Sequence, residues 1–124
     1  MNRLIALAAA AAALVLVTAG CGVGSTGEGQ VAEATGDYLT ALANGDYAAA
    51  CAELAPEAKP TGDCAAGVEA SVADIPAQEI ADDNEGKLTL DVTGDTATVV
   101  LESGTTLELS RMDGDWLVTT PYGR

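Results

Sequence analysis

The sequence predicts an α+β domain in which N-terminal helices pack on an antiparallel β-sheet. Two observations predict it. Between residues 31 and 75 the apolar residues recur at intervals of three and four, whereas beyond Lys87 they alternate with polar residues. The second half also contains Gly94-Asp95 and Asp113-Gly114, dipeptides typical of tight hairpin turns. This order of patterns indicates helices first and a series of hairpin-connected strands second.

The chain begins with an apolar run of 14 residues, Leu4 to Val17, which follows Arg3 and ends shortly before Cys21. The run is too short for an ordinary membrane span of about 20 residues but suits the core of a signal peptide. An uncleaved helical anchor and an ordinary secretory signal cut near Ala19 are the alternatives. The second would leave an unpaired thiol at the new N-terminus, which disfavours it.

The five residues from Val17 to Cys21, Val-Thr-Ala-Gly-Cys, resemble the signal box of bacterial lipoproteins, with Thr18 where leucine is usual. The resemblance implies that residues 1–20 are a lipoprotein signal peptide and that Cys21 receives fatty-acyl chains such as palmitate. Several acyl chains hold a protein on a membrane more firmly than one chain does. We therefore expect lipidation at Cys21 and a place at the extracytoplasmic face of the cell membrane.

Removal of residues 1–20 would leave 104 of 124 residues, enough for one domain and hardly for two. We assign residues 21–30 to the lipidated cysteine and a flexible glycine-rich tether, and residues 31–124 to a single domain. The chain has 5 basic and 19 acidic side chains, a net charge of −14, and loss of Arg3 would make it −15. Such a surface repels nucleic acid and anionic headgroups, so we expect no nucleic-acid partner and membrane contact through the lipid alone.

The three cysteines leave an even pair, Cys51 and Cys64, once Cys21 is acylated. An even pair in an exported domain favours a disulfide. A metal site is the competing interpretation, but the chain has no histidine and no Cys-x-x-Cys pair. We therefore expect a disulfide between Cys51 and Cys64, and no metal or cofactor.

Apolar spacing predicts three helices. The first begins at Val31 and ends at Asn44-Gly45, and the second is capped by Asp46 and ends at Pro56. The third runs from about Asp63 to Asp74, with Thr61 or Asp63 as its cap. The stripe of the second helix points Cys51 inward, and the first turn of the third places Cys64 opposite it. After Pro76, residues 77–81 are interpreted as a short strand and residues 82–86 as a solvated polar turn, which we favour over a calcium loop.

The turns set the register of the predicted strands. A two-residue turn at Gly94-Asp95 pairs Val92 with Ala97, Leu90 with Val99 and Leu88 with Leu101. An odd-length loop around Ser103-Gly104 is needed to keep the apolar residues together, pairing Leu101 with Leu107 and Val99 with Leu109. The turn at Asp113-Gly114 pairs Leu109 with Val118 and Arg111 with Trp116. One face of the sheet is then apolar, and the three helices are expected to cover it.

Four segments in this order resemble small exported proteins of the nuclear transport factor 2-like (SnoaL-like, cystatin-like) superfamily. They are Tyr38–Cys51, Cys64, Gly94–Val99 and Arg111–Val118, within about residues 31–118. The resemblance implies a cone-like domain, a curved sheet wrapped around helices and often enclosing a pocket. It does not imply one activity. None of the catalytic motifs of the superfamily matches this chain, so no catalytic residue is predicted.

Four aromatic or basic residues are candidates for lining such a pocket: Tyr38, Tyr47, Arg111 and Trp116. Both tyrosines lie on helix stripes, where core packing is the alternative to a place at the pocket mouth. Arg111 could bind an anion inside the cone, but we favour a stem packed over Trp116, with a cation–π contact and Asp113 or Asp115 nearby. We expect a membrane-anchored module that binds a protein partner or a small molecule in the envelope. The alternative is a small isomerase or hydrolase with a pocket inside the cone.

Overall fold

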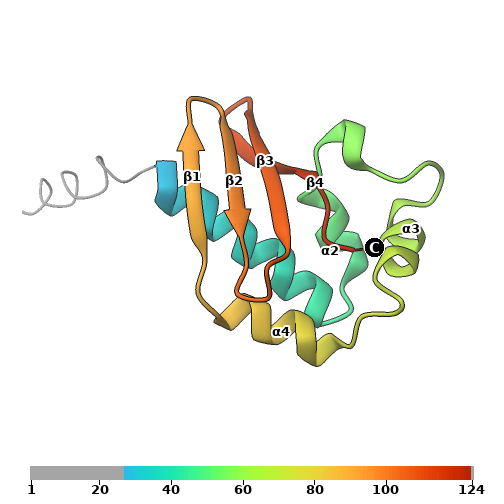
Figure 1. The fold of residues 1–124 in the computed structure, drawn as a ribbon. Helices are drawn as coiled ribbons and strands as arrows, with labels where there is room; N and C mark the ends of the chain where they lie inside the picture. The colour runs from blue at the N-terminus through green and yellow to red at the C-terminus, as the bar shows by residue number, and fades with distance from the viewer. Residues whose placement is uncertain (1–26, 124) are drawn as a thin grey trace, which may run out of the picture.

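A computed structural model describes residues 27–123, so the predictions for Cys21, the signal peptide and most of the tether fall outside the described residues. Within that range the predicted α+β class is confirmed: helices come first and a four-stranded antiparallel sheet follows (Figure 1). None of the helices in this range is long and apolar enough to cross a membrane.

The N-terminal helix is already formed at residue 27 and continues to residue 43. Residues 27–30, which the sequence assigns to the flexible tether, are therefore helical, and that boundary was wrong. Glycine disfavours a helix, but Gly27 lies against Val92 of the sheet and Val31 is buried, so packing outweighs propensity here. The predicted stop at Asn44-Gly45 is confirmed. Gly45 takes a φ of 76°, and the Asp46 N–H donates to the Ala41 carbonyl at 2.8 Å.

Two short helices follow, α2 (Tyr47–Ala52) and α3 (Cys64–Ser71), with the 3₁₀ turn η1 (Pro56–Ala58) between them. Both caps are confirmed, because Asp46 and Asp63 each accept a backbone N–H of the first turn at 3.2 Å. The predicted disulfide between Cys51 and Cys64 is also confirmed, with Cα atoms 6.1 Å apart. It joins α2 to α3.

Helix α4 (Ala77–Glu85) occupies the segment predicted as a strand and a solvated turn, and both of those predictions were wrong. Pro76 precedes the first turn and is compatible with a helix start. Ile80 and Asp83 are three residues apart, lie on one face and are both buried. Only two inward residues, one of them a carboxylate, are too few to give a helical apolar pattern in the sequence.

The sheet consists of β1 (Thr89–Thr93), β2 (Thr96–Val100), β3 (Thr106–Met112) and β4 (Asp115–Thr120), in the order β1-β2-β3-β4. The register predicted for the first and third turns is confirmed for Leu90, Val92, Arg111 and Leu109 with their partners. Leu88 lies before β1, so its predicted pair with Leu101 is not part of the ladder.

The loop between β2 and β3 has five residues, 101–105, so the predicted odd length is confirmed. The predicted partners were wrong by two residues, because Val99 pairs with Leu107 and Ala97 with Leu109. A shift of two residues keeps every side chain on its face. The apolar face is therefore as predicted, with the β1 residues Leu90 and Val92 only partly buried at the sheet edge.

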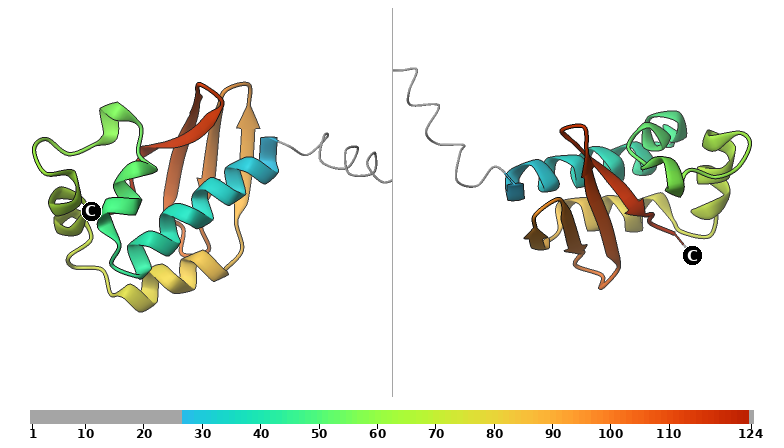
Figure 2. Two further views of the ribbon diagram at one scale, coloured as in Figure 1. Left: turned by 180° about the vertical axis from the view of Figure 1, so that it is seen from behind. Right: turned by 90° about the horizontal axis from the view of Figure 1, so that it is seen from above.

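The cover of this face differs from the prediction. The N-terminal helix lies across it and α4 runs along one end of the strands, whereas α3 stands beside α2, away from the strands (Figure 2). The segment that follows α2 reaches the outer edge of β4 instead. There Val118 donates its N–H to the Glu53 carbonyl, and Ala55 donates to the Val118 carbonyl, both at 2.8 Å. This short parallel bridge fixes the end of α2 next to β4.

Candidate functional site

A surface hollow of about 430 Å³ lies between the N-terminal helix, the end of α2 and the β3–β4 hairpin. Four of its lining residues come from one stripe of the N-terminal helix: Gln30, Glu33, Ala34 and Asp37. Their spacing of three and four residues places them on a single helix face. The other side is formed by Ala52 and Glu53 and by residues 114–117. We call this hollow the acidic groove, because Glu33, Asp37, Glu53 and Asp115 line it.

Local structure fixes both walls of the acidic groove. Glu53 is the C-cap residue of α2, and its carbonyl is held by the Val118 N–H. Asp115 and Trp116 follow a tight turn in which Asp113 and Gly114 have φ angles of 53° and 88°. Two successive positive φ angles are typical of a type I′ hairpin turn, which matches the twist of the flanking strands. The carboxylates of the groove thus come from three different elements that the fold brings together.

The charged side chains that line the acidic groove are all carboxylates. Its lining contains no lysine or arginine, and among residues 27–123 no ion pair reaches any of its four carboxylates. Burial raises the pKa of the Glu53 carboxyl, and the negative charges of Asp37 and Asp115 raise it further. The carboxylate of Glu53 is therefore repelled by carboxylates from two other elements across the groove.

Glu53→Gln is expected to stabilise the protein at pH 7. A raised pKa means that Glu53 favours the fold only while it is protonated, so this contribution is present below the unfolded pKa, near 4.5, and is lost as the pH rises through the folded value. The melting temperature of the variant should exceed that of the wild type at pH 7, and the difference should disappear below about pH 4. Equal melting temperatures at pH 7 would contradict the proposed repulsion. Glu57→Gln, on exposed η1, is the matched control.

Trp116 forms part of the groove lining and is itself only 5% exposed. The predicted cation–π contact is confirmed, with the Arg111 guanidinium carbon 5.9 Å from the ring centroid. The indole Nε1 is buried and donates to no atom of the described residues. A buried N–H without an acceptor is unfavourable, by about 1–3 kcal/mol.

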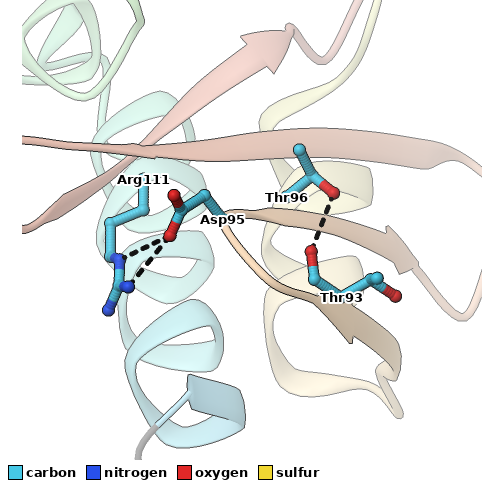
Figure 3. A network of polar contacts seen from close by, with 4 residues as sticks. All are labelled: Thr93, Asp95, Thr96 and Arg111. Atoms are coloured by element: carbon cyan, nitrogen blue, oxygen red, sulfur yellow. Dashed lines mark hydrogen bonds and ion pairs between the residues drawn. The ribbon is translucent and has the colours of Figure 1, made fainter.

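The acidic partner of Arg111 is Asp95, not Asp113 or Asp115 as predicted. Arg111 Nη2 and Nε donate to one Asp95 oxygen at 2.9 and 3.2 Å (Figure 3). The Arg111 backbone N–H also donates to the Asp95 carbonyl. The β1–β2 turn, closed by Thr96 and Thr93, lies beside this end of β3 and brings Asp95 within reach. The Arg111 side chain is 47% exposed and does not line the acidic groove. The ion pair therefore contributes little, about 0–1 kcal/mol.

The two tyrosine candidates do not line the groove either. Tyr47 is half-buried and packs against the core. Tyr38 is 1% exposed, and its hydroxyl accepts the Tyr122 N–H at 3.0 Å. Burial raises the pKa of Tyr38 to about 12, although the Tyr122 hydrogen bond opposes the shift. Of the four candidates from the sequence, only Trp116 belongs to the groove.

Tyr38→Phe is expected to lower the free energy of unfolding at pH 7 by about 1–2 kcal/mol, since the Tyr122 N–H loses its acceptor. Because the folded pKa is raised, the contribution of Tyr38 to stability is complete below pH 10 and is lost as the pH rises towards 12. Between these values the wild type should lose up to about 2–3 kcal/mol that the variant does not lose. Parallel pH profiles in urea denaturation would contradict this assignment.

A buried cluster around Asp83 was missed by the sequence interpretation. Asp83 is 3% exposed and accepts from the Ser103 N–H at 3.2 Å, the Ser103 hydroxyl at 2.9 Å and the Tyr122 hydroxyl at 2.9 Å. It joins α4 to the β2–β3 loop and to the segment after β4. The cluster lies outside the acidic groove and outside a smaller hollow of about 220 Å³ on β2–β4.

Comparison with known proteins assigns no function to the acidic groove. No protein-family model, curated protein or solved structure matches the chain. In the described part of the chain, no three His, Cys, Asp or Glu side chains are grouped so that they could hold a metal ion.

The groove carboxylates could have been suspected only from the spacing of Glu33 and Asp37 along one helix face, which is also the spacing of an ordinary solvated face.

Proposed function

We propose that the chain is an exported, lipid-anchored binding module that contacts its partner through the acidic groove. The acidic groove is the observation that carries the binding function: carboxylates from three elements surround a hollow whose lining includes the only tryptophan of the chain. Its volume of about 430 Å³ lies in the range of small-ligand sites, roughly 300–1,000 Å³. The signal box before Cys21 supports the anchor.

The short distance between Cys21 and the domain supports a function close to the membrane. Helix is already present at residue 27, six residues after Cys21, and six residues reach at most about 20 Å. The groove begins at Gln30 and extends to Asp37 on the same helix, at about 1.5 Å per residue. An acyl chain on Cys21 would therefore hold the groove within a few tens of ångströms of the membrane.

The side chains of the acidic groove favour binding over catalysis by a hydroxyl, thiol or amine nucleophile. Its lining offers carboxylates, one amide and one indole, with no serine, threonine, cysteine, tyrosine or lysine to act as a nucleophile. One observation supports a hydrolase as the second candidate. The raised pKa of Glu53 beside Asp37 and Asp115 resembles the division of roles between a general acid and an ionised carboxylate. Hydrolysis of chromogenic glycosides that Glu53→Gln abolishes would favour that candidate.

Cys21→Ser is expected to release the protein from the membrane fraction without changing its fold. The lipid would be the membrane contact, because a net charge of −14 makes the chain repel anionic headgroups. Full-length wild type and variant should be compared by membrane fractionation, with circular dichroism as the folding control. Retention of the variant in the membrane with its first 20 residues uncleaved would indicate a helical anchor and contradict the proposal.

The binding function itself is tested by photo-crosslinking in the envelope. A photoreactive amino acid at Gln30, in the groove, should give one defined adduct that mass spectrometry identifies. The same amino acid at Glu69, exposed on α3 and outside the groove, is the matched control. Identical adducts from both positions, or none from Gln30, would count against the groove as the contact site.

A further inference from the structure

The two edges of the sheet differ in what pairs with them. The outer edge of β4 is paired, because Val118 bonds to Glu53 and Ala55 of the segment after α2. Strand β1 forms the opposite edge, and no other described segment pairs with it there (Figure 1). It has no proline, and its ladder with β2 has no bulge, although both features commonly protect an exposed edge. In the described structure the edge of β1 is therefore open to a further strand.

Every second residue of β1 has backbone groups at this open edge. Thr93 and Thr96 close the two-residue turn as a hydrogen-bonded pair, so the odd-numbered residues of β1 bond to β2. The N–H and carbonyl groups of Leu90 and Val92 therefore point to the open edge, and Leu88 precedes them at the same spacing. None of these three makes a backbone hydrogen bond to another described residue. Backbone groups with this spacing match the ladder of an added strand.

The side chains at the open edge are apolar and only partly covered. Leu88, Leu90 and Val92 are half-buried and pack against the edge of the core. Between them Thr89 and Asp91 are exposed on the other face of the sheet. An added strand would cover the apolar edge best if it alternated in the same way, apolar towards the helices and polar outwards. β1 is itself such a strand.

A second copy of β1 meets these requirements in one antiparallel register. When Leu90 lies opposite Leu90 of the second copy, Leu88 lies opposite its Val92, and all three residues with free backbone groups form hydrogen-bonded pairs. Thr89 then lies opposite Asp91. A register centred on Asp91 would instead place two carboxylates directly opposite each other, which is unfavourable.

The charges at the edge are complementary in the register centred on Leu90. Lys87 is exposed and forms no ion pair with the described residues. Extended by two residues, this register places Lys87 diagonally across from Asp91 of the second copy, within reach of a long side chain. The two Asp91 carboxylates are also diagonal to each other, and the two lysines offset their repulsion.

We propose that two copies of the chain associate through β1 in this register and join their sheets into one. Opposite residues of an antiparallel pair share a face, so the N-terminal helices of both copies lie on the same face. Gly27 lies against Val92, and the two chains therefore enter the dimer at points roughly 15 Å apart. Given the proposed lipid on Cys21, both anchors can reach one membrane. Residues 87–93 do not line the acidic groove, so the dimer is independent of the groove contact.

Cysteine crosslinking in membranes tests the register. Thr89→Cys and Asp91→Cys replace exposed side chains that make no hydrogen bond to described residues. Opposite each other across the dimer, their Cα atoms would be about 4.5 Å apart, close enough for a disulfide. Two copies of the same variant place their cysteines diagonally, about 7–8 Å apart, which is too far. Full-length acylated chains with different tags are co-expressed and oxidised in the membrane. We expect about tenfold more mixed dimer than same-variant dimer.

Thr106→Cys, exposed on the inner strand β3, is combined with Asp91→Cys to measure random collision. A yield of the mixed dimer no higher than this control, or no higher than the same-variant dimers, would overturn the inference. A photoreactive amino acid at Asp91 of the otherwise unchanged chain identifies any other occupant of the edge. An adduct with a different protein, or with residues 21–26 of the same chain, in place of the dimer would also overturn it.

Discussion

Asp83→Ala is expected to lower the free energy of unfolding by about 2–4 kcal/mol, because it removes a buried carboxylate that connects three parts of the fold. The Asp83 carboxylate is 3% exposed and accepts three hydrogen bonds, two from Ser103 and one from Tyr122. Alanine would remove the Asp83 bond to the buried Tyr122 hydroxyl, and a hydrogen bond to a charged group contributes about 1.5–3 kcal/mol. The two bonds from Ser103 add less, because Ser103 is exposed and its hydroxyl also lies 3.1 Å from Thr105 Oγ1. Urea denaturation of the purified chain at pH 7 measures the change.

Asp82→Ala is the matched control, because Asp82 is the exposed neighbour of Asp83 on α4 and accepts from Gln78 across one turn. Its effect should stay within about 0.5 kcal/mol. Tyr122→Phe should lie between the two variants, since it removes one of the three donors and leaves the others paired. A loss below about 1 kcal/mol for Asp83→Ala would show that the cluster does not hold α4 to the sheet.

Removal of the disulfide is expected to lower the free energy of unfolding by about 3 kcal/mol. Cys51 and Cys64 are 13 residues apart, and closing a loop of that length restricts the unfolded chain. The bond also has a direct structural role, because α3 packs beside α2 and away from the sheet. The double variant Cys51→Ala and Cys64→Ala, compared with wild type by urea denaturation, measures the effect.

Reduction of the wild type should reproduce the loss, whereas the reductant should not change the double variant. Neither Cys51 nor Cys64 lines the acidic groove, so Trp116 fluorescence of the folded protein should be the same in both forms. An unchanged midpoint of unfolding on reduction would contradict a stabilising role for the bond.

Much of the sheet could be predicted from the sequence because strand periodicity and two-residue turns leave few choices. Gly94-Asp95 and Asp113-Gly114 fix the register on either side, and both registers are confirmed. For the loop between β2 and β3, the alternation of apolar and polar residues requires only that the number of loop residues be odd. This requirement could not choose between strand pairings two residues apart. Parity nevertheless identified the buried face, because a shift of two residues does not exchange the faces.

Helix α4 and the helical start at residue 27 could not be predicted, because tertiary contacts decide both. In α4 the inward residues are Ile80 and Asp83, and the burial of Asp83 depends on Ser103 and Tyr122, distant in the sequence. At residue 27 a glycine-rich segment is helical next to Val92 of β1. Local propensity is a weak guide where packing supplies most of the stability of a helix.

The candidate site was predicted in part. The contact between Arg111 and Trp116 followed from strand register, but the acidic partner of Arg111 did not, since Asp95 is close in space and Asp113 is close in sequence. The groove carboxylates Asp37, Glu53 and Asp115 belong to three elements, and nothing in their spacing relates them. Their juxtaposition depends on the bridge between the end of α2 and β4, which no local pattern indicates.

One measurement tests most directly whether the domain is anchored by a lipid and closed by a disulfide. It is the intact mass of the protein extracted from membranes, recorded before and after reduction. The expected mass is that of residues 21–124 plus fatty-acyl groups on Cys21, with a gain of two hydrogens on reduction. A mass of the full chain of 124 residues without lipid, unchanged by reduction, would contradict both the anchor and the disulfide.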